Sequence, residues 1–319
     1  MAATADQLKL LVKAHYSGDA ERFNTLILQI AAAEATKGHV TLARELKAIV
    51  DSTKITPQKS LYVDPEIDDL LILKQSNTLL SDLIIKKEIE ESLRTILKEY
   101  YNRHKLSIYN ISNRKKLLLA GPPGTGKTLT ASALANELKL PLYIVQTDKI
   151  ITKYLGETSQ KLSKVFAFIE TFEAVYLFDE FDSIASERNF ENDIGEIRRV
   201  INSFLQQIET SNKSFIIGAT NNPQLLDKAI FRRFDDIIFY DLPDANQRKK
   251  IIKNNLSLFI INELDFISLG KISKGLSHAE LINACKDVMK DCILNDSEVT
   301  TELVIKSIEK RKLTFLWGN

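Results

Sequence analysis

The chain has 319 residues, of which 44% are hydrophobic and 27% are charged. Both fractions are close to globular averages, which excludes a disordered chain, a collagen-like chain or a coiled-coil rod. Lysine and arginine number 43 against 42 for aspartate and glutamate, so no overall basic field favours nucleic acid, and any site for a charged ligand must be local.

The sequence carries no signal for export or for a membrane. No run approaches the roughly eighteen apolar residues of a spanning helix, and the N-terminus lacks a basic region followed by an apolar one. Cys285 and Cys292 lie in one helical run, where a disulfide is geometrically unfavourable, so we expect buried thiols. These features predict a cytoplasmic protein.

The N-terminal residues form a separate region. Residues 4–50 show helical spacing of apolar side chains in three short stretches, interrupted near Gly18 and Gly38. Because the charges in this region balance, we expect residues 1–52 to form a three-helix interaction domain. Residues 53–78 lose this periodicity and contain Pro57 and Pro65, so we expect a linker.

Strand-like and helix-like segments alternate after residue 78. This alternation predicts an α/β fold, with a doubly wound, parallel, five-stranded sheet in a core domain over residues 79–243. The expected strands are residues 116–120, 142–145, 175–178, 214–217 and 236–240.

The strand pattern stops at Pro243, and residues 244–319 are predicted to form a helical lid. Two of its helices open with capping-box patterns, Asp244 with Gln247 and Ser277 with Glu280.

The strongest motif is a glycine-rich loop between the first expected core strand and a helix. Its spacing, G-x-x-x-x-G-K-T, lets backbone N–H groups converge on phosphate oxygens at a helix N-terminus. A glycine-rich turn formed by chance is the alternative, but the flanking strand and helix disfavour it. The candidate nucleotide-binding residues here are Gly121, Pro122, Pro123, Gly124, Thr125, Gly126, Lys127, Thr128 and Leu129.

Two acidic residues end a buried strand about fifty residues further on. Asp179 is a candidate Mg²⁺ ligand together with Thr128, and Glu180 is a candidate base for the attacking water. The simpler interpretation is a strand that ends in solvent, where acids are common.

From residue 79 to the C-terminus these motifs resemble those of the AAA+ ATPases, and within them the classical AAA group. The resemblance rests on the loop Gly121–Thr128, on Asp179-Glu180 and on Asn221 after the fourth expected core strand. It implies hydrolysis of ATP with Mg²⁺, with Asn221 positioning the attacking water. An Asn-Asn-Pro sequence is also an ordinary turn.

Arg232 and Arg233 resemble the family's arginine-finger segment, in which an arginine acts on the nucleotide of a neighbouring subunit. A solvated arginine pair is the alternative, and the sequence leaves open which of the two is the finger. Action across an interface requires an oligomeric ring, expected to be a hexamer.

Two further segments match the family's pattern. Tyr154, Leu155 and Gly156 resemble the first pore loop, which grips a polypeptide, although such a tripeptide is more often core followed by a helix stop. Ser277 and Ala279 resemble the lid motif beside the bound nucleotide.

The resemblance implies a ring-forming ATPase that remodels, unfolds or threads a protein. The alternative is a nucleotide-dependent assembly switch that acts on a partner without threading. Residues 1–52 resemble segments of short prokaryotic AAA proteins whose genes often neighbour a subtilisin-type peptidase, and also resemble adaptors of severing and membrane-remodelling relatives. Nucleic acid is disfavoured, although Arg114-Lys-Lys116 and Arg248-Lys-Lys250 form local basic runs.

Overall fold

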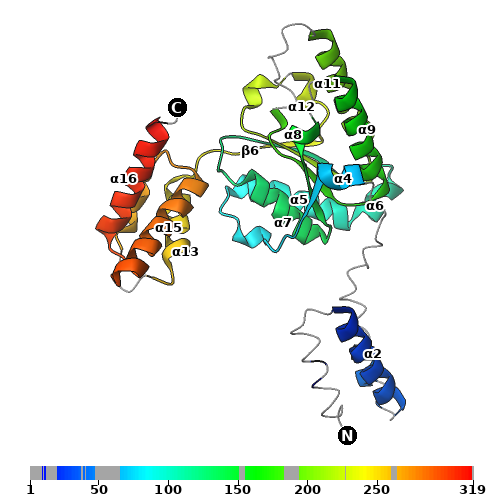
Figure 1. The fold of residues 1–319 in the computed structure, drawn as a ribbon, viewed down its shortest axis with the longest axis horizontal. Helices are drawn as coiled ribbons and strands as arrows, with labels where there is room; N and C mark the ends of the chain where they lie inside the picture. The colour runs from blue at the N-terminus through cyan, green and yellow to red at the C-terminus, as the bar shows by residue number, and fades with distance from the viewer. Residues whose placement is uncertain are drawn as a thin grey trace. The chain divides into compact units, whose positions relative to one another are not determined.

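The computed structural model describes residues 9, 11, 20–36, 39, 41–46, 65–150, 155–182, 194–226, 228–259 and 264–317 (Figure 1). The chain divides into two compact units, residues 1–63 and 64–319. In the first unit α2 spans Ala20–Thr36, and residues 41–46 are also helical. These match the second and third expected helices, whereas most of the first lies outside the described residues.

The second unit is built on a six-stranded sheet with the order β1-β3-β4-β5-β2-β6. β2 to β6 are parallel, as predicted, and β1 pairs with β3 in the antiparallel direction. The strands are β1 (Leu71–Lys74), β2 (Lys116–Ala120), β3 (Leu142–Val145), β4 (Val175–Phe178), β5 (Phe215–Thr220) and β6 (Asp236–Phe239).

The prediction that residues 53–78 form only a linker is wrong for its second half. α4 (Pro65–Leu70) leads directly into β1, which adds a sixth strand to the sheet. Leu70 and Leu71 are buried, and Leu71 pairs with Val145. Burial of these leucines stabilises a strand too short to stand out in the sequence.

Helices cover both faces of the sheet (Figure 1), and successive side chains of a strand point to opposite faces. Leu117 and Leu119 pack with α5 and α7 in one apolar cluster. On the other face, Phe178 packs against Phe166 of α9 and Phe204 of α11. The helical segments of this part are η1 (Leu80–Asp82), α5 (Lys87–Tyr101), α6 (Arg103–Ile108), α7 (Lys127–Leu138), α8 (Thr147–Ile150), α9 (Leu155–Thr171), α11 (Ile194–Thr210), η2 (Pro223–Leu225) and α12 (Lys228–Phe231).

The helical lid has its own apolar core. It contains α13 (Ala245–Leu256), α14 (Phe266–Ile272), α15 (His278–Asn295) and α16 (Thr301–Trp317). Both predicted capping boxes are confirmed, at the starts of α13 and α15. Cys285 and Cys292 are free and buried on α15, as expected, and burial raises the pKa of the Cys285 thiol to about 12. Among the helices that the structure describes, none combines the length and apolar character needed to cross a bilayer.

Candidate functional site

The sheet order brings three of the predicted motifs to one edge. β5 lies between β4 and β2, and the three strands are parallel, so their carboxyl ends lie side by side. The glycine-rich loop follows β2, Asp179 and Glu180 follow β4, and Asn221 follows β5. The topology therefore gathers motifs that are up to a hundred residues apart in the sequence.

The loop ends at the N-terminus of α7, which begins at Lys127. Gly126 occupies the N-cap position with a left-handed backbone, φ +104°, and no side chain caps the helix. The N–H groups of the first turn are therefore available to a ligand, and a helix N-terminus favours an anion. This arrangement suits a phosphate group.

Lys127 joins the loop to the end of β5. Its Nζ donates to the carbonyl oxygens of Gly121 at 2.6 Å and Pro122 at 2.8 Å, and to Oδ1 of Asn221 at 2.8 Å. Burial lowers the pKa of the Lys127 ammonium, while the nearby carboxylates of Asp179 and Asp182 oppose that shift. Since an ammonium has three donors, a phosphate oxygen that binds Lys127 must replace or share one of these acceptors.

The second pair of polar groups joins α7 to the end of β4. The Thr128 hydroxyl donates to Oδ2 of Asp179 at 2.8 Å, and the backbone N–H of Glu180 donates to Oδ1 at 3.0 Å. A hydroxyl and a carboxylate in contact are hard oxygen ligands, which fit Mg²⁺. Glu180 has a left-handed backbone, φ +51°, and an exposed side chain.

The lid touches the loop through the start of α15. Ser277 caps this helix by accepting from the N–H of Glu280, and the N–H of Ala279 donates to the carbonyl oxygen of Gly124 at 3.0 Å. The two predicted lid residues therefore lie against the predicted phosphate loop, and the contact joins the lid to the sheet domain.

Sequence reasoning missed a second lid contact, between His278 and Ile84. Nε2 of His278 lies 2.7 Å from the carbonyl oxygen of Ile84 and must carry the proton, because a carbonyl oxygen only accepts. Nδ1 is buried without a hydrogen-bond partner, and burial lowers the pKa of the imidazole. The sequence around Ile84 does not indicate this contact, because the acceptor is the backbone oxygen of Ile84, and every residue has such an oxygen.

The two candidate finger arginines differ in their surroundings. Arg233 forms an ion pair with Glu209 of α11 and is partly buried. Arg232 is exposed, and among the described residues its side chain makes no hydrogen bond or ion pair. Of these two arginines, Arg232 is therefore the one whose guanidinium has no bonding partner within the part of the chain that the structure describes.

The remaining residues predicted for the site differ in burial, and one of them lies outside the described residues. Thr125 is buried and donates to the carbonyl oxygen of Pro122 at 2.8 Å, whereas Pro123 and Leu129 are exposed. Tyr154 lies outside the described residues. Leu155 begins α9, and Gly156 is exposed in its first turn.

Each of the two basic runs contains residues whose side chains are bonded within the fold. Arg114 bonds to Glu99 and Asp236, and the Nζ of Lys116 donates to the carbonyl oxygen of Glu209. The side chain of Arg248 is buried and donates only to carbonyl oxygens, those of Pro243 and Gly270. Arg114, Lys116 and Arg248 therefore do not form free basic patches, contrary to the interpretation of these runs as basic surface.

Comparisons with known proteins agree with the geometry of the site. Residues 117–242 match the family described as "ATPase family associated with various cellular activities (AAA)". An uncharacterised AAA family ATPase of Sinorhizobium fredii is 32% identical over 300 residues, which cover 92% of this chain and 90% of that protein. A protein of Methanothermobacter thermautotrophicus, named as a homologue of a 26S proteasome regulatory subunit, is 29% identical over 277 residues, covering 84% of this chain and 73% of that protein.

A crystal structure of the FIGL-1 AAA domain has the same fold, with a TM-score of 0.63 and 22% identity over 80% of this chain and 92% of that one. The full-length likeness to the Sinorhizobium protein and the match over the sheet domain confirm the resemblance that the motifs indicated. The chain is an ATP-hydrolysing enzyme that belongs to the AAA family of ATPases.

Proposed function

We propose that this ATPase works with Mg²⁺, assembles as a ring, and uses ATP hydrolysis to unfold, thread or remodel a protein substrate. The observation that carries the proposal is the hydrogen-bonded set at the edge of the sheet, Lys127 with Asn221 and Thr128 with Asp179. These hydrogen bonds place the residues proposed to bind phosphate and metal next to Asn221, which is proposed to orient the attacking water.

Each residue has a distinct role in this proposal. Lys127 and the first-turn N–H groups of α7 bind the phosphates. Thr128 and Asp179 would hold Mg²⁺, which neutralises charge on phosphate oxygens when bound. Glu180 accepts a proton from the attacking water. A phosphate that replaces Asn221 on Lys127 frees the Asn221 amide to orient that water.

The ring is supported by the difference between the two arginines. Phosphoryl transfer gains from a cation placed on the developing charge, and an arginine from another subunit can supply it. Arg232 is exposed and free for this task, whereas Glu209 holds Arg233. We therefore assign Arg232 as the finger and Arg233 as the residue that positions the segment.

The substrate class rests on relatives rather than on the site. One relative is named as a homologue of a 26S proteasome regulatory subunit, which supports a protein substrate and an oligomer. Tyr154, Leu155 and Gly156 are proposed to grip that substrate, and residues 1–52 to bind a partner such as a subtilisin-type peptidase.

The first experiment separates nucleotide binding from hydrolysis. Lys127→Ala should lose ATP binding, whereas Glu180→Gln should bind ATP and lose turnover, because Lys127 is assigned to the phosphates and Glu180 to the attacking water. Titration with a fluorescent ATP analogue and a phosphate-release assay measure the two properties. Equal loss of ATP affinity in both variants would contradict the assigned roles.

Mixed rings test action across the interface. Lys127→Ala and Arg232→Ala subunits should each be inactive alone, and their mixture should regain activity where an intact site meets an intact finger. Mixtures with Arg233→Ala are the matched control. If proven co-assembly restores no activity, the finger assignment is wrong. Loss of protein unfolding in Tyr154→Ala, with ATPase activity retained, would favour threading over the assembly switch.

A further inference from the structure

Asn222 has no role in the site described above, although it lies directly after Asn221 at the end of β5. Its side-chain amide donates to Oδ2 of Asp182 at 2.9 Å. Asp182 lies two residues beyond Glu180, in the segment that follows β4. This hydrogen bond therefore joins the two segments that carry the residues proposed to act on the attacking water.

The side chain of Glu180 is exposed, and it makes no hydrogen bond or ion pair with any residue that the structure describes. Its position therefore depends on its backbone, which has a left-handed φ of +51°. A residue other than glycine keeps this conformation only where its surroundings hold it. The residues on either side of Glu180 must therefore fix where its carboxylate lies.

Both flanks of Glu180 are anchored, but in different ways. Before it, Asp179 accepts a hydrogen bond from the N–H of Glu180 itself. After it, Phe181 is buried and packs against the ring of Phe204. Apolar packing is non-directional, whereas a hydrogen bond fixes a direction. The bond to Asp182 therefore supplies the directional anchor on this side.

The backbone of Asn222 is itself held in place. Its N–H donates to the hydroxyl of Thr220 at 3.1 Å, and Thr220 is buried at the end of β5. Pro223 follows, and a residue before proline has few backbone conformations available. The Asn222 amide is therefore presented from a rigid part of the sheet, as a group that positions another residue requires.

We propose that Asn222 is a positioning residue for hydrolysis, because through Asp182 it holds Glu180 beside the attacking water. The two adjacent asparagines then have different tasks. Asn221 accepts from Lys127 at the phosphate end of the site, whereas Asn222 fixes the segment that carries the base. This inference rests on the proposed function, in which Glu180 accepts a proton from that water.

The experiment measures ATP affinity and turnover separately in the full-length chain. Asn222→Ala removes the hydrogen bond, and Asn222→Asp places two carboxylates against each other. We expect both variants to bind a fluorescent ATP analogue like the parent and to lose about ten- to a hundredfold in kcat, because the base shifts while the phosphate-binding groups remain. A loss of ATP affinity that accounts for the whole effect would contradict a positioning role.

Exchange of the two bonded groups gives a sharper result. Asp182→Asn alone keeps an oxygen that accepts from the Asn222 amide, so it should retain most of the parent's kcat. Added to Asn222→Asp, it again pairs an amide with a carboxylate and should restore kcat. If Asp182→Asn alone is as slow as Asn222→Asp, or if the exchange restores nothing, the proposal is wrong.

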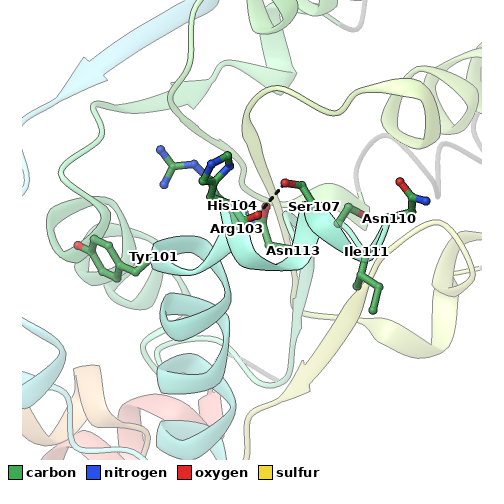
Figure 2. A pocket seen from close by; sticks show the side chains of 8 residues that line it. Tyr101, Arg103, His104, Ser107, Asn110, Ile111 and Asn113 are labelled. Carbon is green, nitrogen blue, oxygen red and sulfur yellow. Dashed lines mark hydrogen bonds between the residues drawn. The ribbon is translucent and has the colours of Figure 1, made fainter.

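Asn113→Ala is the matched control. The Asn113 amide donates to the carbonyl oxygen of Arg114 at 3.3 Å, and Figure 2 shows Asn113 among the residues that line an open hollow beside α6. Asn113 precedes β2, so it lies at the edge of the sheet opposite the site. Asn113→Ala should leave kcat unchanged even where it lowers the melting temperature.

A second background tests whether Asn222 acts through Glu180. Single-turnover hydrolysis by Glu180→Gln should become no slower when Asn222→Ala is added, because the displaced segment no longer carries a base. A further loss of the same size as in the parent would mean that Asn222 acts on another step, and would overturn the proposal.

Failure of this inference is distinguishable from failure of the proposed function. If Glu180→Gln hydrolyses ATP like the parent, the base is wrongly assigned, and the inference fails with it. If Glu180→Gln is inactive while Asn222→Ala and Asn222→Asp turn over normally, the positioning role alone is refuted.

Discussion

Replacing Gly124 by alanine tests the contact between the lid and the phosphate loop. A Cβ on Gly124 would lie 2.6 Å from Oγ of Ser277 and 3.0 Å from Cβ of Ala279, and the backbone φ is +72°. The first distance is shorter than atoms tolerate, so the lid or the loop must shift. Gly126 is the matched control, because its φ is +104° and a Cβ there meets nothing within 4 Å.

The two substitutions share backbone strain but differ in the clash. A left-handed backbone costs alanine about 1–2 kcal/mol, and overpacking adds about 1–3 kcal/mol. Gly126→Ala should therefore lower the free energy of unfolding by about 1–2 kcal/mol and Gly124→Ala by about 2–5 kcal/mol. At about 2–4 °C per kcal/mol for a unit of this size, the melting temperatures should differ by about 2–12 °C.

Thermal unfolding of the nucleotide-free protein, followed by circular dichroism, measures the difference. Ser277→Gly should recover much of the loss in Gly124→Ala, because it removes the clashing oxygen, and glycine at an N-cap costs only a few tenths of a kcal/mol. Equal destabilisation by the two glycine substitutions, or no recovery with Ser277→Gly, would show that the lid does not contact the loop in solution.

Two further predictions concern the lid. Burial lowers the pKa of His278 below its ordinary value of 6.5, so the unfolded chain takes up a proton that the folded chain does not, and this contribution to stability is lost as the pH falls through about 6.5. His278→Asn should lose less melting temperature than the parent between about pH 7.5 and 5.5, and identical pH profiles would refute this. Arg248→Met should lower the free energy of unfolding by about 2–4 kcal/mol, because two buried carbonyl oxygens lose their donor, whereas the exposed control Lys250→Met should change it by less than about 0.5 kcal/mol in urea unfolding. A basic surface patch at Arg248 would instead make the two variants alike.

The sequence by itself determined the elements whose signals are local. Short apolar runs between helical segments located β2 to β6, because a buried parallel strand is recognisable from its own residues. The capping boxes at Asp244 and Ser277 located the starts of α13 and α15 to within one residue, because the bonds join groups three positions apart. The loop from Gly121 to Thr128 indicated phosphate for the same reason, since one short segment supplies all its donors.

Only the tertiary structure decided what depends on partners far away in the chain. Four residues from Leu71 form a strand because β3 offers them an edge to pair with, and Leu71 is buried there. In the sequence Arg248 is indistinguishable from a surface charge, yet its side chain is buried and donates to the carbonyl oxygens of Pro243 and Gly270. Arg232 and Arg233 are adjacent in the sequence, but the ion pair with Glu209 is made by Arg233, so their side chains have different surroundings. In each case the energy comes from a contact that spans many residues, and no local pattern contains that contact.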